Sequence, residues 1–231
     1  SPVGSVITLA ADFTIDGNCA LNAGLLTGMG GVLDVGGALT FNGMTSVNPP
    51  LIRCAGDFFA APSFAPTTQT IEPDGAATTT FGPVTPGGTL NLRSVKFKNG
   101  TRLAASDMTF NATGFSIDAG AGFDIDNHRV VMPALAMSLN GRLAAQAGGK
   151  IALRPASAIT MTSTSALELV GTFDNLAQVE SDGGPGYGFT IRGQVKALNF
   201  GFKDMGPAGV ALVPGAVLAP APHDFRRGVF D

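Results

Sequence analysis

The sequence predicts an all-β protein, and among all-β folds it favours a parallel β-helix, or β-solenoid, over a β-sandwich or jelly roll. Short runs with apolar residues at every second position occur throughout the chain. Windows with helical periodicity are almost absent, and a loose strand-and-turn unit recurs about every 20 residues. Together these features are typical of a chain that winds into stacked coils of short strands.

The predicted strands are short runs that end at Gly, Asn or Asp, residues that favour turns. The clearest runs cover residues 6–9, 13–15, 31–35, 38–41, 90–92, 94–97, 115–117, 123–125, 151–153 and 159–162. Alternation places one side of each run in a core and the other side in solvent. The best helical window, residues 135–146, contains Asn140-Gly141, a dipeptide that indicates a turn between two strands.

The loose repeat is what favours a coil over other all-β folds. Five segments begin with an apolar-x-apolar pair followed by a second short strand and a turn, and they start at Leu33, Leu90, Phe115, Leu135 and Ile151. In a solenoid, each such unit buries its inward face only by stacking on a neighbour. Asn-Gly turns also suit the hairpins of a sandwich, so the recurrence decides in favour of the β-helix.

Residues 48–88 interrupt the repeat because they are rich in proline and threonine. Proline lacks the backbone donor that a central strand uses. We therefore predict an irregular excursion at 48–88, an inserted loop or hairpin that leaves the stack. This excursion is too short for a second domain, so residues 1–231 are predicted to form a single β-solenoid domain.

The C-terminal third, residues 171–231, carries the clearest coil-like segments, at Gly186–Gly193, Ala197–Gly206 and Ala208–Leu212. A strand ending in Phe is followed by a short polar turn and then by Gly-apolar-x-apolar. These segments resemble the right-handed parallel β-helix repeats of large bacterial secreted and cell-surface proteins. The resemblance is good over this third and loose elsewhere, and it implies an extracellular or cell-surface location.

Composition argues against several classes of function. The 14 Lys and Arg residues are scattered and the formal net charge is −3, so no basic stripe is present to bind nucleic acid. No apolar run reaches the roughly 18 residues of a membrane span. The aromatic set is 16 Phe with one Tyr and no Trp, which suits a dry interior better than a carbohydrate-binding platform.

The two cysteines, Cys19 and Cys54, leave two alternatives open. A disulfide between them would suit an oxidising compartment. Two reduced, buried thiols are the other alternative, and the spacing does not decide between them. Two cysteines without nearby histidines do not make a zinc site.

The strongest candidate for chemistry is the acidic group formed by Asp118, Asp124, Asp126 and His128. Asp124 and Asp126 alternate on a predicted strand, so both side chains are expected on one face, with His128 next in line. The interpretation that we favour is a solvated outer face, with aspartates that cap turns.

Two functional interpretations of the same acids remain as alternatives. Enzymes of the β-helix class that cleave polysaccharides use carboxylates on such a face, which would make Asp124 and Asp126 catalytic, with Arg129 or Lys150 as the basic partner. Oxygen-rich loops also suit calcium, for which Asp118, Asp124 and Asp126 are weak candidate ligands. No other cofactor or metal is expected.

The function that the sequence favours is a non-catalytic structural or adhesive module of an extracellular or cell-surface protein. Charged residues make up only 13% of the chain, as in many secreted β-rich proteins and proteins that contact copies of themselves. Both ends look like open strand patterns, so the module is expected to self-assemble end to end into a filament or coat. Val229 and Phe230 form the expected self-association edge.

The partners expected for this module are copies of itself or other surface proteins, with polysaccharide as a further candidate. Two functions remain as alternatives. One is a polysaccharide lyase or glycoside hydrolase of the β-helix class, and the other is a segment of a phage or virus fibre.

Overall fold

The computed structural model describes residues 6–9, 11–28, 30–47, 49–184 and 186–231. In these residues the chain forms strands and no helix, and the strands stack as a parallel β-solenoid of about nine turns. This confirms the predicted fold class. The strand pairings among these residues are parallel, whereas a β-sandwich or jelly roll is built from antiparallel pairs.

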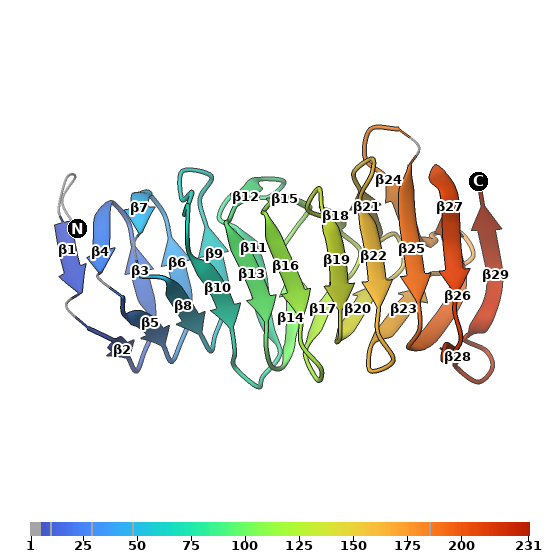
Figure 1. The fold of residues 1–231 in the computed structure, drawn as a ribbon, viewed down its shortest axis with the longest axis horizontal. Coiled ribbons are helices and arrows are strands. Elements are labelled where there is room, and N and C mark those ends of the chain that lie inside the picture. The colour runs from blue at the N-terminus through green and yellow to red at the C-terminus, as the bar shows by residue number, and fades with distance from the viewer. Residues whose placement is uncertain (1–5, 10, 29, 48, 185) are drawn as a thin grey trace. The chain divides into compact units, whose positions relative to one another are not determined.

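The chain divides into two compact units, an N-terminal unit of residues 1–115 and a C-terminal unit of residues 116–231. In both units the coils are built from a first, a second and a third strand, and equivalent strands of successive coils pair in parallel (Figure 1). The coil of β8 and β9 differs, because residues 61–69 form a loop in place of its third strand. The prediction of a single domain stays a prediction.

The strands of the N-terminal unit follow this succession of three. The first strands are β2 (Phe13–Ile15), β5 (Val32–Val35), β8 (Leu51–Cys54), β10 (Thr70–Pro73) and β13 (Ser94–Phe97). The second strands are β3 (Cys19–Leu21), β6 (Leu39–Phe41), β9 (Phe58–Ala60), β11 (Thr79–Pro83) and β14 (Thr101–Ala104). The third strands are β1 (Val6–Leu9), β4 (Gly24–Gly28), β7 (Met44–Val47), β12 (Thr89–Asn91) and β15 (Met108–Asn111). The strand β16 (Gly114–Ile117) spans the boundary between the units.

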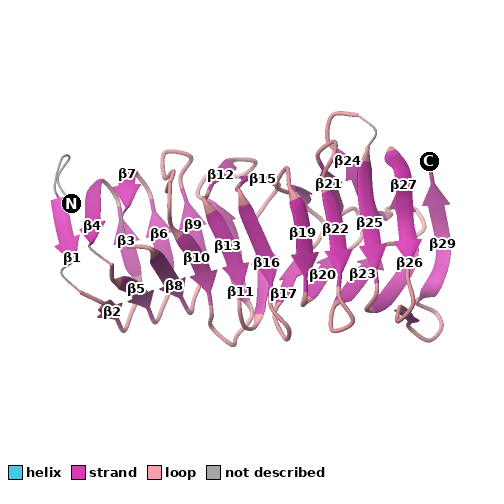
Figure 2. Cartoon of the chain, in the orientation of Figure 1, coloured by secondary structure: helices cyan, strands magenta, loops and turns pink. Residues whose placement is uncertain are grey.

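The C-terminal unit repeats the succession (Figure 2). The first strands are β19 (Ala136–Leu139), β22 (Ala158–Met161), β25 (Tyr187–Ile191) and β27 (Met205–Leu212). The second strands are β17 (Gly122–Asp124), β20 (Arg142–Ala145), β23 (Ala166–Val170) and β28 (Val217–Leu218), and the third strands are β18 (Arg129–Val131), β21 (Lys150–Leu153), β24 (Ala177–Ser181) and β29 (Asp224–Phe230). The long β26 (Gln194–Phe202) is the second and the third strand of its coil, because its first half pairs with β23 and its second half pairs with β24.

Phenylalanine rings fill much of the interior of the N-terminal unit. Phe58 stacks on Phe81 with ring centroids 4.9 Å apart, and Phe81 stacks on Phe110 at 5.9 Å. All three rings are buried, one from each of three neighbouring coils. Such pairs contribute about 0.5–1.5 kcal/mol each beyond the burial of their surface. The Phe-rich composition therefore stabilises the stack directly, by connecting one coil to the next.

Glycine is required at corners where the backbone of one coil presses on the next. A Cβ atom on Gly75 would lie 1.9 Å from the carbonyl oxygen of Ala55, and one on Gly141 would lie 2.4 Å from that of Ala121. Coils spaced about 4.8 Å apart leave no room for a side chain at these positions. The turn predicted at Asn140-Gly141 is confirmed, since it separates β19 from β20.

The predicted excursion at 48–88 is shorter than expected. Strands β8 to β11 all lie in the stack, and only residues 61–69 leave it as a long loop. Pro73 and Pro83 are the last residues of their strands, where the missing N–H donor does little harm, and the carbonyl of Pro73 still accepts a hydrogen bond from the amide of Lys98. The loop itself returns Phe64 to the core, stacked on Phe41 at 4.0 Å.

Candidate functional site

Four charged side chains of alternating sign line the outer face of the second strands in the C-terminal unit. We call Asp124, Arg142, Glu168 and Lys196 the C-terminal ladder. The Nη2 atom of Arg142 lies 3.1 Å from Asp124 Oδ2 and 3.0 Å from Glu168 Oε2, and Lys196 Nζ lies 3.8 Å from Glu168 Oε2. Burial disfavours the charged form of Arg142, but the hydrogen bonds and charges of Glu168 and Asp124 outweigh it and raise the pKa of Arg142. Each carboxylate of the ladder is therefore held by a cation from a neighbouring coil.

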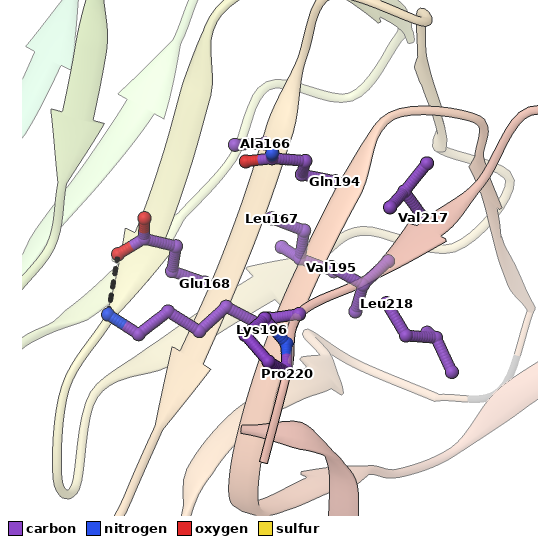
Figure 3. A pocket seen from close by; sticks show the side chains of 10 residues that line it. Ala166, Leu167, Glu168, Gln194, Val195, Lys196, Val217, Leu218 and Pro220 are labelled. Carbon is purple, nitrogen blue, oxygen red and sulfur yellow. Dashed lines mark ion pairs between the residues drawn. The ribbon is translucent and has the colours of Figure 1, made fainter. Parts of the chain in front are cut away.

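A shallow pocket of about 200 Å³ opens beside this ladder (Figure 3). Glu168 and Lys196 line it as an ion pair, together with Gln194, Leu218 and Pro220. A general acid or base needs a carboxyl group that can exchange a proton with a substrate. The carboxylate of Glu168 is bound by both Arg142 and Lys196, which makes it a structural group of the sheet.

The structure places the two predicted catalytic aspartates in different settings. Strand β17 ends at Asp124, whose Oδ1 accepts a hydrogen bond of 2.9 Å from the amide of Asp126. Asp126 lies in the following turn with a φ of 51° and is exposed. The expectation that both point from one strand face is wrong, because the chain turns left-handed at Asp126 to leave the strand. Asp124 instead caps this turn.

Arg129, the predicted basic partner, belongs to a separate network on the third strands. It lies on β18, where its Nε is 2.7 Å from Glu180 Oε1 and its Nη2 is 2.8 Å from Asp182 Oδ1. Lys150 Nζ lies 3.6 Å from Glu180 Oε2. Arg129 is thus engaged with Glu180 and Asp182, and catalysis by Asp124, Asp126 and Arg129 stays a prediction.

The other two members of the acidic group, Asp118 and His128, lie in the turns before and after β17. The carbonyl of Asp118 accepts a hydrogen bond from the amide of Ala121, and the amide of His128 donates to the carbonyl of Ile125. Within the described ranges of the chain, no group of three or more His, Cys, Asp or Glu side chains is arranged to hold a metal ion. Calcium binding by Asp118, Asp124 and Asp126 stays a prediction.

The two cysteines are free thiols in the structure, so the disulfide alternative is not formed. Cys19 lies on β3 and Cys54 on β8, in strands of different position that are two coils apart. Two coil steps amount to about 9.5 Å, beyond the roughly 7 Å between Cα atoms that a disulfide spans. Burial raises the pKa of the Cys54 thiol to about 12.

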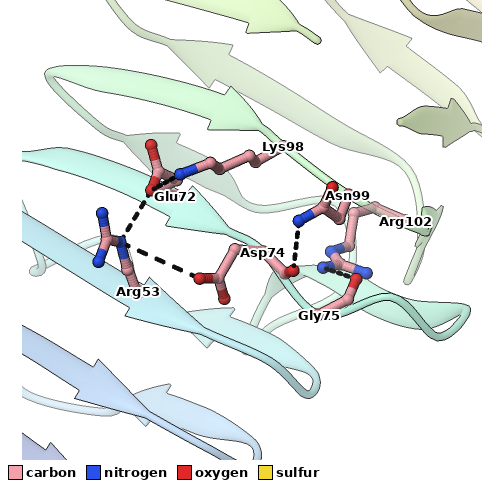
Figure 4. A network of polar contacts seen from close by, with 7 residues as sticks. All are labelled: Arg53, Glu72, Asp74, Gly75, Lys98, Asn99 and Arg102. Atoms are coloured by element: carbon pink, nitrogen blue, oxygen red, sulfur yellow. Dashed lines mark hydrogen bonds and ion pairs between the residues drawn. The ribbon is translucent and has the colours of Figure 1, made fainter. Parts of the chain in front are cut away.

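A second ladder runs along the first strands of the N-terminal unit. We call Asp34, Arg53, Glu72 and Lys98 the N-terminal ladder; Lys98 directly follows β13, and Figure 4 draws Arg53, Glu72 and Lys98. Arg53 pairs in register with Asp34 on one side and Glu72 on the other, and Glu72 Oε1 lies 2.9 Å from Arg53 Nε and 3.3 Å from Lys98 Nζ. Burial alone would raise the pKa of Glu72, but the hydrogen bonds from Arg53 and Lys98 outweigh it and lower the pKa below its ordinary value.

Neither ladder was recognised from the sequence. The signal would have been an acid on one strand with a base at the same place, or two residues away, on the equivalent strand of the next coil. Finding it requires the register of the coils, because the ladder partners stand 18 to 28 residues apart.

The side chain of Arg102 is an inward-pointing cation in the N-terminal unit. It is fully buried, whereas its neighbour Leu103 is partly exposed. Its guanidinium donates to the carbonyl oxygen of Gly75 at 2.9 Å (Figure 4). It also donates to that of Ala77 at 3.0 Å, and both carbonyls lie in the turn between β10 and β11. Burial lowers the pKa of Arg102. The guanidinium thus holds a corner of the stack by satisfying carbonyls that would otherwise be buried without donors.

The last coil of the C-terminal unit exposes side chains that point inward by register. Leu212, Leu218 and Phe230 pair with Ile191, Val195 and Phe202, which are fully buried. The three outer residues are nevertheless 44%, 46% and 51% exposed. They are exposed because no described residue covers them from the next coil position. Phe230, one of the two residues of the expected self-association edge, belongs to this set, while Val229 is 41% exposed beside it.

The first coil of the N-terminal unit is open in the same way. Phe13 is 47% exposed, although its register partner Leu33 is buried. Cys19 and Leu21 are partly exposed, although Leu39 and Phe41, their partners one coil on, are fully buried. We call these two surfaces the first-coil face and the last-coil face. Both present the cross-section of a core and an unpaired strand edge, so they are the candidate functional surfaces.

Comparison with known proteins assigns the chain to no group: no family model, no curated protein and no solved structure matches it. In the part of the chain that the structure describes, no helix has the length and apolar character needed to cross a membrane. The functional argument therefore rests on the geometry of this chain.

The pKa of Glu72 predicts how the N-terminal ladder responds to pH. Because this pKa is lower in the folded chain than the ordinary value of 4.5, the ladder stabilises the fold fully above pH 4.5. That stabilisation is lost as the pH falls through the folded value. We expect Glu72→Gln to cost about 1 kcal/mol of unfolding free energy at pH 7, with the difference from wild type vanishing toward pH 3. Urea unfolding across this range, with the exposed Asp174→Asn as control, measures it; a pH-independent difference contradicts the assignment.

Arg102 predicts a larger effect that depends little on pH above 5. Replacement by Met keeps the length of the side chain but leaves the carbonyls of Gly75 and Ala77 without a donor, so we expect a loss of about 3 kcal/mol. Arg93→Met, at an exposed arginine of the same unit, should change stability by less than about 0.5 kcal/mol. Urea unfolding midpoints compare the two variants, and equal losses would show that the buried guanidinium has no special role.

Proposed function

We propose that this chain is a non-catalytic structural module of an extracellular or cell-surface protein, and that its open coil faces are extended end to end by further coils. The observation that carries the proposal is the exposure of inward-pointing side chains on both faces. Terminal coils of a solenoid that end in solvent carry a polar outer face. Leu212, Leu218, Phe230 and Phe13 have the opposite character.

The polar chemistry of the two units supports a structural role. Glu72, Glu168 and Glu180 each contact two cations. A carboxylate held between two cations of neighbouring strands stabilises the stacking of coils. This favours the module over the alternative of a polysaccharide-cleaving enzyme that uses Asp124, Asp126 and Arg129.

The extracellular setting is supported by the sequence of the C-terminal third. Its coil-like segments resemble repeats of large bacterial secreted and cell-surface proteins, and they fall on strands β25, β26 and β27. The low charged fraction of 13% is consistent with a surface that contacts other copies or other surface proteins. A segment of a viral fibre would share these properties.

The proposal predicts that the last-coil face controls assembly. Leu218 and Val217 are neighbours on β28 with similar exposure, but Leu218 points inward and Val217, the register partner of the exposed Gln194, points outward. We expect Leu218→Asp to abolish rods in negative-stain images and to lower the mass seen by sedimentation. Val217→Asp should leave both unchanged, because it adds the same charge outside the core cross-section.

Both variants should fold, since each residue is about half exposed in the isolated chain. Circular dichroism and thermal unfolding check this directly. A wild-type chain that stays monomeric at every concentration tested would contradict end-to-end assembly.

A further inference from the structure

The position of β1 in its coil limits how one copy can stack on another. Counted in threes along the chain, β27, β28 and β29 are the first, second and third strands of the last coil. The first complete coil is β2, β3 and β4, and β1 is a third strand that pairs with β4 from the outer side. Suppose that β2 and β3 of a second copy pair with β27 and β28. Then β29 of the first copy and β1 of the second copy would both need the position next to β4 of the second copy.

Resting on the proposed function, we propose that the partner of the last-coil face is the first-coil face of a second copy, with strand replacement. The strands β27 and β28 pair in parallel with β2 and β3 of the next copy. The strand β29 takes the place of β1 under β4 of that copy. The alternative that keeps β1 in place leaves the positions above β27 and β28 empty, with an apolar gap between the copies.

The inward side chains of the two faces match in spacing. In the coils that begin with β2, β5, β19 and β25, the last inward residue of the first strand and the first inward residue of the second are four residues apart, as in Ile15 to Cys19 and Ile191 to Val195. Leu212 and Leu218 lie directly over Ile191 and Val195 in register. A copy that continues the stack therefore places its Ile15 on Leu212 and its Cys19 on Leu218.

A head-to-tail contact covers both open faces, whereas a two-fold tail-to-tail contact leaves every first-coil face exposed. A head-to-tail contact is heterologous and continues the parallel pairing found between coils within each unit.

The strand β29 is suited to replace β1. It has seven residues, and β1 has four. It is held in its own copy through β26, and its side chains from Arg226 onward are exposed. The strand β1 pairs only with β4 among the described strands. In the free chain β1 thus acts as a removable cap over part of the first-coil face.

Cross-linking through the native thiol of Cys19 tests the register. Neighbouring Cα atoms across parallel strands lie about 5 Å apart, within the range that a disulfide spans. Under mild oxidation, Leu218→Cys should give a ladder of covalent dimers, trimers and longer species on a non-reducing gel. The ladder forms because each copy has one thiol on each face, and Cys54 is buried within the unit.

Two matched variants distinguish the head-to-tail contact from a tail-to-tail contact. Val217→Cys, which points outward on the same strand, should give no ladder. Leu218→Cys combined with Cys19→Ser should lose the ladder altogether; a covalent dimer that persists in this double variant comes from a tail-to-tail contact and overturns the proposal. Rods in wild-type images without a ladder in Leu218→Cys overturn this register while leaving end-to-end assembly standing. Absence of both rods and ladder contradicts both proposals.

Strand replacement has its own test in the Leu218→Cys background. Removal of residues 1–10 deletes β1, and Thr8→Pro weakens its pairing with β4 by a single substitution. Both changes should raise the initial rate of ladder formation at least about tenfold, which corresponds to the removal of a competing strand worth about 1.4 kcal/mol. An unchanged or slower rate in both variants would show that β1 does not occupy the place that β29 takes.

Discussion

The structure depends on hydrogen bonding between parallel coils that lie about 4.8 Å apart. A single coil is one strand thick and has no hydrophobic core of its own, so each inward side chain is covered only by the coils on either side. Phe58, Phe81 and Phe110 illustrate this, since their ring contacts all connect one coil with another. The same spacing removes the space for a Cβ atom at Gly75 and Gly141. The spacing between coils thus determines both how the core packs and where glycine is required at the corners.

This spacing also determines which polar groups are tolerated. A charge on the outer face has neighbours of its own row only in the coils above and below, so a row of like charges would repel at about 5 Å. Both ladders avoid this by placing a cation of a neighbouring coil beside each acid. Arg53 and Lys196 stand in register with their acids, and Arg142 and Lys98 reach theirs from two residues off register. At the buried corner, where no carboxylate reaches, Arg102 uses the carbonyls of Gly75 and Ala77 instead. The polar groups therefore stabilise the contacts between coils, in the same direction as the core.

The local part of this fold was predictable from the sequence, and the part that depends on register was not. Alternation located β5, β6 and β13 to within one residue, because inward and outward positions are set within a strand. Pro73 misled the prediction for 48–88, because a proline at the end of a strand and a proline in a loop look alike without the pairing partner. The prediction that Asp124 and Asp126 share a strand face was wrong for another reason. Asp126 has a left-handed backbone conformation, so the strand and its alternation end at Asp124. The two ladders could be found only once the register between neighbouring coils was known.

The first-coil face and the last-coil face depend both on the alternation within a strand and on the register between coils. Each half-exposed inward residue, such as Leu218 or Phe230, forgoes about 1 kcal/mol of the burial that its partner one coil earlier obtains. The residues that lose this burial are the ones that the alternation in the sequence predicts to point inward. The outermost described coil thus has apolar residues at its inward positions, as the covered coils do. A face meant for water would have polar residues at these positions, as Gln194 and Lys196 are on the outer side of β26. The last-coil face has therefore kept the chemistry of an interior, and an interior is complete only when another coil lies on it.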